Sequence, residues 1–119
     1  MKAEIRVTGN FSKRAKHLIK KYPSLVDELK VLEKALTDNP QLGTPLGSDT
    51  YKIRLSIKSK GKGKSGGARV ITYVEGEIVG TVEQSTDGKV TVYLLTIYDK
   101  SETASISNRE LKELIKHKS

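Results

Sequence analysis

Apolar and polar residues alternate along several stretches of the chain, which is the two-residue period of β-strands with one buried face. In the clearest stretch, apolar positions from Tyr51 to Ile57 are separated by polar ones from Lys52 to Lys58. Residues 90–98 are apolar almost throughout, which favours a strand inside a sheet. The pattern therefore predicts strands at residues 3–8, 51–58, 68–74, 78–82 and 90–98, with a hairpin turn at Asp87-Gly88.

Two segments near the N-terminus show the three- and four-residue spacing of amphipathic helices. The first is predicted to begin at Ser12 and to end at about Tyr22, and the second to begin at Ser24 and to stop before Pro40. Only two or three residues separate them, which favours an antiparallel helical hairpin. The predicted core-facing residues are Phe11, Ala15, Leu18 and Tyr22 on the first helix, and Leu25, Leu29, Leu32 and Leu36 on the second.

A short C-terminal helix is predicted after residue 107. Ser107 and Glu110 have the spacing of a capping box, and Leu111, Leu114 and Ile115 form the inward-facing stripe. Residues 1–119 are enough for one domain but not for two. The order of elements predicts an α+β fold: a mostly antiparallel sheet, an N-terminal helical hairpin and a short C-terminal helix, with the helices on one face of the sheet.

The net charge of +8 is high for a chain of 119 residues. Such a charge predicts attraction to nucleic acid, to an acidic protein or to an anionic membrane surface. No stretch approaches 18 consecutive apolar residues, and residues 1–9 lack the apolar region of a secretory leader. With no cysteine in the chain, disulfides and thiolate metal sites are excluded. A cytoplasmic protein without a membrane partner is the simplest interpretation.

The cations are concentrated between residues 52 and 69, where seven basic residues and no acidic residue occur. Lys52 and Arg54 are two apart on one strand, so their side chains leave the same face about 7 Å apart. Arg69 is expected opposite or diagonal to them, and Lys100 is expected to enter the same region. An acid-free concentration of cations is typical of a phosphate-binding surface.

These four residues are the catalytic candidates, because clustered cations stabilise the charge of a phosphoryl transition state. Mutual repulsion also lowers the pKa of a lysine, so that it can act as a general base. RNA supplies its own nucleophile, the 2′-hydroxyl, and needs neither metal nor cofactor. The alternative is a solvated polar face of an amphipathic strand. The two histidines have no carboxylate or histidine at ligand spacing, which argues against a metal site.

The Lys/Gly-rich stretch after the strand supplies the candidate RNA-binding residues, namely Lys58, Lys60, Lys62 and Lys64. Lysines of this kind follow a phosphate backbone and make binding sensitive to salt. The alternative is an ordinary surface hairpin. Gly63-Lys64-Ser65 is similar to the end of a phosphate-binding loop, but Lys58 stands where that motif needs glycine, and a strand follows instead of a helix.

The segments KIRLSIKSKGKGKSGGARVITYV and VYLLTIYDKSE, followed by SISNRELKEL, resemble the RelE/HigB toxins of bacterial type II toxin–antitoxin systems. The resemblance covers essentially the whole chain in the right order. It implies a microbial-ribonuclease-like fold and cleavage of mRNA by 2′-hydroxyl attack, usually in the ribosomal A site. It also implies an antitoxin partner, expected to carry a DNA-binding helix-turn-helix, and contact with operator DNA only through that complex.

The resemblance also assigns roles to the candidate residues. Lys52 or Arg54 corresponds to a base or phosphate anchor, Arg69 to a phosphate clamp, and Lys100 to a leaving-group acid or second clamp. Some relatives place a tyrosine near the C-terminus to orient a base, whereas the segment after Asp99 has none. Tyr98 or Tyr93 is the expected substitute, and otherwise catalysis is expected to be weak.

Three functions use the same basic face, and charge alone does not separate them. The first is the ribosome-dependent mRNA endonuclease. The second is a non-catalytic RNA- or ribosome-binding module on the same scaffold. The third is a basic subunit, or degenerate toxin, that binds only its acidic protein partner.

Overall fold

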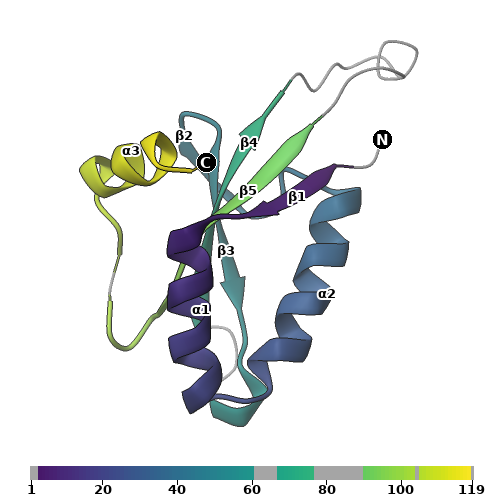
Figure 1. Cartoon of the computed structure of the whole chain (residues 1–119), viewed down its shortest axis with the longest axis vertical. Helices are drawn as coiled ribbons and strands as arrows, with labels where there is room; N and C mark the ends of the chain where they lie inside the picture. Colours follow the sequence, from purple (N-terminus) through teal and green to yellow (C-terminus); the bar gives the residue numbers. More distant parts are fainter. Residues whose placement is uncertain (1–2, 61–66, 77–89, 104, 119) are drawn as a thin grey trace.

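The computed structural model describes residues 3–60, 67–76, 90–103 and 105–118, except for the side chain of Lys60. Five strands form one mixed sheet in the order β1-β5-β4-β3-β2 (Figure 1). β1 runs parallel to β5, and every other neighbouring pair is antiparallel. The strands are β1 (Glu4–Val7), β2 (Thr44–Gly47), β3 (Thr50–Leu55), β4 (Ala68–Glu75) and β5 (Thr91–Asp99).

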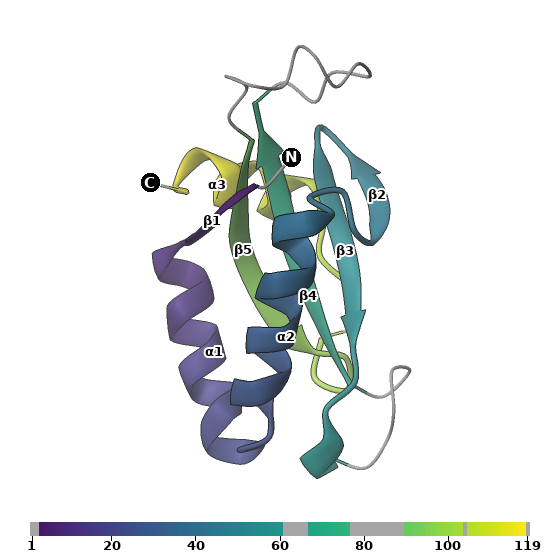
Figure 2. The same cartoon turned by 90° about the vertical axis from the view of Figure 1, so that its right-hand side faces the viewer.

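The helices lie on both faces of this sheet. Helices α1 (Gly9–Lys21) and α2 (Leu25–Asp38) pack side by side on one face, here called the hairpin face (Figure 2). Helix α3 (Asn108–Lys116) packs on the other, here called the open face. The expectation that all helices share one face is therefore wrong for α3. Its apolar stripe needs apolar surface, and Ile71 and Leu95 supply it on the open face.

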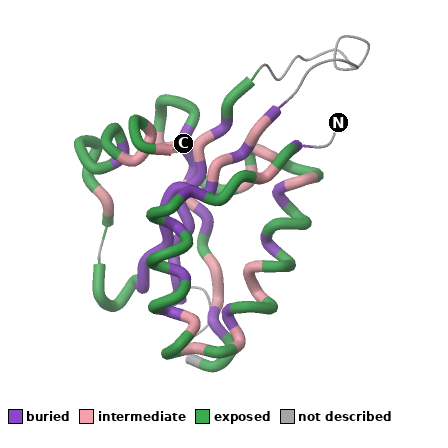
Figure 3. Tube along the Cα trace, in the orientation of Figure 1, coloured by how far each residue is buried: buried purple, intermediate pink, exposed green. Residues whose placement is uncertain are grey.

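Alternation along the strands separates the two faces. Ile53, Val70 and Val92 belong to the apolar cluster under α1 and α2, which contains most of the buried apolar side chains. Arg54 and Ile71, one residue further along β3 and β4, point to the open face. Figure 3 shows long buried stretches where β4 and β5 run, and these two strands are buried almost throughout, whereas the helices carry exposed stripes. The core therefore lies on the hairpin face, and the open face is only partly covered.

Helix α1 begins earlier than predicted. Thr8, and not Ser12, occupies the N-cap position, and its hydroxyl oxygen accepts a hydrogen bond from the Phe11 N–H at 3.2 Å. The same hydroxyl donates to the carbonyl oxygen of Leu94 at 2.8 Å, which ties the helix to β5. Gly9 and Asn10, which lie before the predicted start, form the first turn of the helix, because the cap comes directly after β1.

The other two helix starts are close to their predicted positions. Ser24 precedes α2, but its hydroxyl makes no capping bond and contacts Glu28 Oε1 instead, at 3.3 Å. Ser107 and Glu110 form the predicted capping box of α3, in which both reciprocal hydrogen bonds are present. Leu111 is buried, and Leu114 and Ile115 are half-buried against the open face. The sequence thus predicted the start and the inward stripe of α3 correctly.

Strand β2 was not predicted, since residues 41–49 read as a connector punctuated by glycine and proline. Pro45 is tolerated because β2 lies at the sheet edge, where a missing N–H breaks no inner ladder. The predicted strand at residues 78–82 and the turn at Asp87-Gly88 lie outside the described residues. Within the ranges that the structure describes, no helix is long and apolar enough to cross a membrane.

Candidate nucleic-acid interface

A row of three polar side chains crosses the open face near one end of the sheet. Arg54 on β3 is the register partner of Arg69 on β4, and Arg69 is in turn the partner of Tyr98 on β5. Residues directly opposite one another on neighbouring strands project to the same face. We call Arg54, Arg69 and Tyr98 the arginine row. It confirms that Arg69 lies opposite a basic residue of the preceding strand.

The three residues of the row differ in exposure. Arg54 is exposed, whereas Arg69 is only 4% exposed and Tyr98 is 8% exposed. The Arg69 guanidinium donates a hydrogen bond to the carbonyl oxygen of Ala68 at 3.1 Å. Two arginines directly opposite one another are an unfavourable cross-strand pair. An exposed arginine and a nearly buried one therefore lie on neighbouring strands at this end of the sheet, where the buried Asp99 is the register partner of Ala68.

Lys52 lies on the open face of β3, two residues before Arg54. It is half-buried, and its register partner is Ile71, which is packed against α3. Gly43 fixes the backbone beside it: this glycine has φ of +106°, and a Cβ atom there would stand 2.6 Å from the Lys52 carbonyl oxygen. Lys52 is thus held at the border between the arginine row and the part of the open face that α3 covers.

Tyr98 is held in its neutral form. Burial raises the pKa of its phenol above the ordinary value of 10.0, and the positive charge of Arg69 opposes this effect. At neutral pH the hydroxyl therefore keeps its proton and can donate a hydrogen bond to an anionic oxygen. The row joins two permanent cations to one neutral donor, which is a suitable set for a phosphate group.

Lys100 follows β5 in a turn that is fixed by Asp99. The carboxylate of Asp99 is 2% exposed and accepts hydrogen bonds from the Ser101 N–H at 2.9 Å and the Ser101 hydroxyl at 2.7 Å. The Tyr22 hydroxyl donates to its other oxygen at 3.2 Å. The N–H of Lys100 donates to the Gly67 carbonyl oxygen at 3.0 Å. The exposed Lys100 therefore lies at the same end of the sheet as Arg69.

Lys58 lies apart from the arginine row. It begins the 3₁₀ helix η1 (Lys58–Lys60), whose backbone is bound to the start of α2. The Lys58 N–H donates to Glu28 Oε2 at 2.7 Å, and the Ser59 N–H donates to Ser24 Oγ at 3.0 Å. The Lys58 side chain is exposed on this docked segment. Lys62 and Lys64 lie outside the described residues, as does the side chain of Lys60.

The structure thus divides the predicted site residues into two groups. Arg54, Arg69 and Tyr98 are direct neighbours, with Lys52 one row along and Lys100 at the same sheet end. Lys58 belongs to the helical hairpin side. The sequence placed Lys52, Arg54 and Arg69 correctly by two-residue alternation, because all three stand on strands where that period fixes the face.

Asp99 and Gly67 position the site but were not identified from the sequence. An aspartate two residues before a serine, at the end of a strand, is the signal of an Asx-type turn. A Cβ atom on Gly67 would collide with the carbonyl oxygen of Leu55, so β3 and β4 approach closely there. The signal for Gly67 was weak, because the chain has several glycines in this region.

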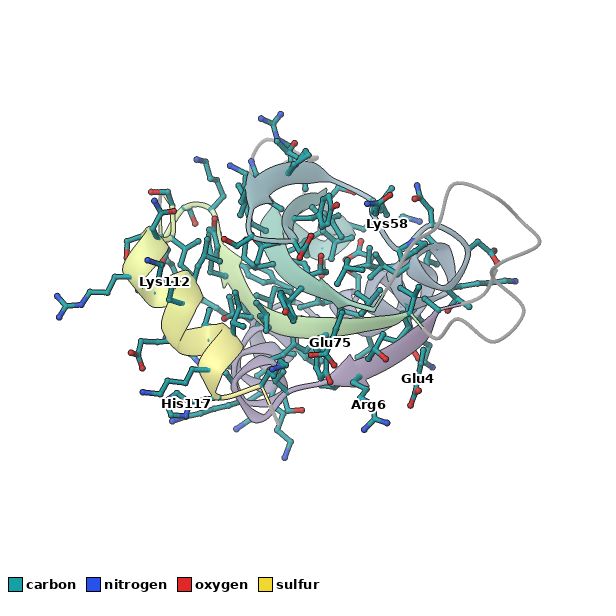
Figure 4. The ribbon with its side chains drawn as sticks, turned by 90° about the horizontal axis from the view of Figure 1, so that it is seen from above. Glu4, Arg6, Lys58, Glu75, Lys112 and His117 are labelled. Atoms are coloured by element: carbon teal, nitrogen blue, oxygen red, sulfur yellow. The ribbon has the colours of Figure 1, made fainter. Side chains whose placement is uncertain are left out.

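Other kinds of site find little support in the described part of the chain. It contains no group of three histidine, cysteine, aspartate or glutamate side chains arranged to hold a metal ion. His17 is exposed on α1. His117 lies 3.4 Å from Glu113, one helical turn away, at the exposed end of α3. Figure 4 labels His117 at that end of the helix and shows Glu4 and Arg6 together on β1. No protein-family model matches the chain.

Proposed function

We propose that this protein is an endoribonuclease toxin of the RelE/HigB type that cleaves ribosome-bound mRNA. One observation carries the proposal: Arg54 and Arg69 stand directly opposite one another on the open face, beside the neutral phenol of Tyr98. Pairing like charges across strands lowers stability. An anionic ligand bound between them compensates for that repulsion, and a phosphodiester has the required charge and acceptor oxygens.

The reaction in this proposal needs only RNA and the protein. The 2′-hydroxyl loses its proton and attacks the adjacent phosphorus, the bond from phosphorus to the 5′-oxygen breaks, and that oxygen takes up a proton. Arg54 and Arg69 stabilise the additional negative charge on the phosphoryl oxygens. Arg54 anchors the phosphate, Lys52 also anchors it or, as the neutral amine, accepts the first proton, and Lys100 supplies the second. The products are a 2′,3′-cyclic phosphate and a free 5′-hydroxyl.

The proposal includes a protein partner, and the resemblance supports it. A cognate antitoxin, acidic or amphipathic, would cover the basic open face and block access of RNA to Arg54. Contact with operator DNA would come through that complex. No metal ion or cofactor takes part in this mechanism.

Toeprinting on translating ribosomes tests the proposal. The wild-type chain should arrest growth when it is induced in a bacterium and should produce discrete cleavage within the A-site codon. Arg54→Ala should reduce the cleavage rate about 100-fold, the usual effect of removing one donor to a transition-state charge. Lys112→Ala is the matched control, since Lys112 is an exposed cation on α3 away from the row, and its cleavage rate should equal that of the wild type.

A non-catalytic RNA-binding module is the second candidate, favoured by the burial of Arg69 and Tyr98. In that case only Arg54 and the neighbouring lysines contact RNA, and RNA is bound but not cut. Growth arrest without cleavage would favour this candidate over the nuclease. Absence of both arrest and RNA binding would leave only the interaction with an acidic partner.

A further inference from the structure

A groove with both polar and apolar lining lies between the start of α1 and helix α3, beside β5. It has a volume of about 580 Å³, and Thr8, Asn10, Arg14, Thr96, Arg109 and Glu113 are among its lining residues. Small-molecule sites usually have volumes of about 300–1,000 Å³. The groove is therefore large enough for a ligand such as a nucleotide.

One end of the groove is suited to an anion. Asn10 and Arg14 are four residues apart on α1, so they lie on the same side of that helix. Arg109 enters the groove from the first turn of α3. Neither arginine forms an ion pair with any other residue that the structure describes. The first turn of α1 contains no acidic residue, so its positive dipole end is not neutralised.

Thr96 provides independent evidence that a ligand binds there. Its side chain lines the groove and is only 6% exposed. Across the ranges that the structure describes, its hydroxyl has no hydrogen-bond partner, although the hydroxyl of Thr8 beside it has three. The Thr96 oxygen is not among the buried side-chain oxygens that lack a partner, so it is accessible from the groove, where a ligand oxygen could accept its hydrogen bond.

The rest of the groove is suited to the sugar and base of a nucleotide. Glu113 supplies a carboxylate that can accept hydrogen bonds from ribose hydroxyls or base N–H groups. Glu110 is already engaged in the capping box with Ser107. Ile106 and Leu114 add apolar surface for a base. Two arginines, a hydroxyl donor, a carboxylate and an apolar wall together match a nucleoside phosphate better than a simple anion.

We propose that this groove binds a nucleotide, with the phosphate at Arg14, Arg109 and the Thr96 hydroxyl. The nucleotide has two sources, a free nucleoside monophosphate or one unit of an RNA strand. Thr96 is two residues from Tyr98 on β5, so the groove adjoins the arginine row. The inference does not rest on the proposed nuclease activity, because the groove residues are different from those of the row.

Calorimetric titration with uridine monophosphate, uridine and inorganic phosphate tests the proposal. The monophosphate should bind, inorganic phosphate should bind at least tenfold more weakly, and uridine should show no measurable binding. Arg14→Ala and Arg109→Ala should each weaken monophosphate binding about tenfold or more, as expected for losing a charged hydrogen bond. Thr96→Val should weaken it about fivefold, because valine cannot donate a hydrogen bond to the phosphate.

Two further measurements distinguish the sources of the nucleotide. If an RNA strand occupies the groove, a short oligouridylate should bind more tightly than the monophosphate, and Arg54→Ala should weaken only the oligouridylate. If the ligand is a free nucleotide, both should bind equally and Arg54→Ala should change neither. Monophosphate affinity that is unchanged in Arg14→Ala, Arg109→Ala and Thr96→Val, or absent in the wild type, would overturn the proposal. Loss of cleavage in Arg54→Ala has no bearing on this result.

Discussion

Strands β3 and β4 present two different surfaces on their two faces. On the hairpin face, Ile53 is paired with Val70, and both are buried in the apolar cluster under α1 and α2. One residue further along, on the open face, Arg54 is paired with Arg69. The same backbone ladder therefore joins two apolar side chains on one side and two like charges on the other.

This difference indicates where the stability of the fold comes from and where the proposed function is located. Burial of apolar surface on the hairpin face contributes about 25 cal/mol per Å². A directly opposed pair of cations contributes nothing favourable and lowers stability instead. The sheet retains the arginine pair because the hairpin face and the patch under α3 supply enough apolar burial. The hairpin face is thus the structural side, and the arginine row is the surface available for an anion.

The largest expected effect comes from alanine substitutions at two consecutive residues of β3 that face opposite sides of the sheet. Ile53→Ala should lower the free energy of unfolding by about 2–5 kcal/mol, because it leaves a cavity in the buried cluster. Arg54→Ala should change it by less than about 0.5 kcal/mol, or raise it slightly by removing repulsion from Arg69. Urea denaturation of both variants measures the difference. Equal losses would show that the two faces contribute alike to stability.

Arg54→Ala should also alter RNA binding. The affinity for single-stranded RNA should fall. The slope of log K against log salt concentration should become shallower by about 1, the value for one lost phosphate contact. Ile53→Ala at a temperature where it remains folded should keep the wild-type slope. An unchanged slope in Arg54→Ala would place the RNA elsewhere on the molecule.

The next effect concerns the close approach of β3 and β4. Gly67→Ala should lower the free energy of unfolding by about 1–3 kcal/mol, because its Cβ would collide with the Leu55 carbonyl oxygen. It should also displace Lys100, whose N–H donates to the Gly67 carbonyl oxygen. Gly9→Ala is the matched control, since a Cβ there would meet no atom within 4 Å apart from its chain neighbours and the backbone of its own helix. Thermal melts of the two variants compare the positions directly.

A smaller effect is expected at the cap of α3. Ser107→Ala removes the hydroxyl that accepts from the Glu110 N–H at 3.1 Å, and should lower helix stability by about 1 kcal/mol. Hydrogen exchange should accelerate in α3, while the amides of β4, which are paired with β3 and β5, keep their protection. Exchange that accelerates equally in α1 would mean that α3 is part of the main cooperative unit, and would contradict the division between the faces.

The sequence predicted most of this fold because its patterns are local. Alternation placed Arg54 and Lys52 on one face, and the spacing of Ser107 and Glu110 gave the start of α3. The face that α3 covers was not predictable, since it depends on which apolar patch remains uncovered after α1 and α2 have packed. Strand β2 was missed because an edge strand of four residues containing proline has almost no periodicity.

The candidate site was less predictable than the fold. Residue type and position identified Arg69, but its burial depends on three neighbouring strands and has no signature in the sequence. That the hydroxyl of Thr96 lines a groove and has no hydrogen-bond partner among the described residues depends on tertiary contacts, which the sequence does not show. Asp99 carried a recognisable turn signal, although its contact with Tyr22 joins residues 77 positions apart. Local patterns therefore predict which residues share a face, whereas tertiary contacts determine their chemistry.

The smallest expected effect is the pH dependence contributed by Tyr98. Its pKa is raised in the folded state, mainly by burial and despite the charge of Arg69, so the unfolded chain ionises first as the pH rises above the ordinary value of 10.0. The neutral phenol's contribution to stability is complete below that value and is lost as the pH rises through the folded pKa. The free energy of unfolding of the wild type should therefore fall relative to Tyr98→Phe only above pH 10. The free energy of unfolding of the wild type should likewise fall relative to Tyr93→Phe above pH 10, because burial and the Glu75 carboxylate raise the pKa of Tyr93. Parallel denaturation curves of the wild type and Tyr98→Phe at neutral pH and above pH 10 measure this, and a constant difference would mean that Tyr98 is as solvated as it is in the unfolded chain.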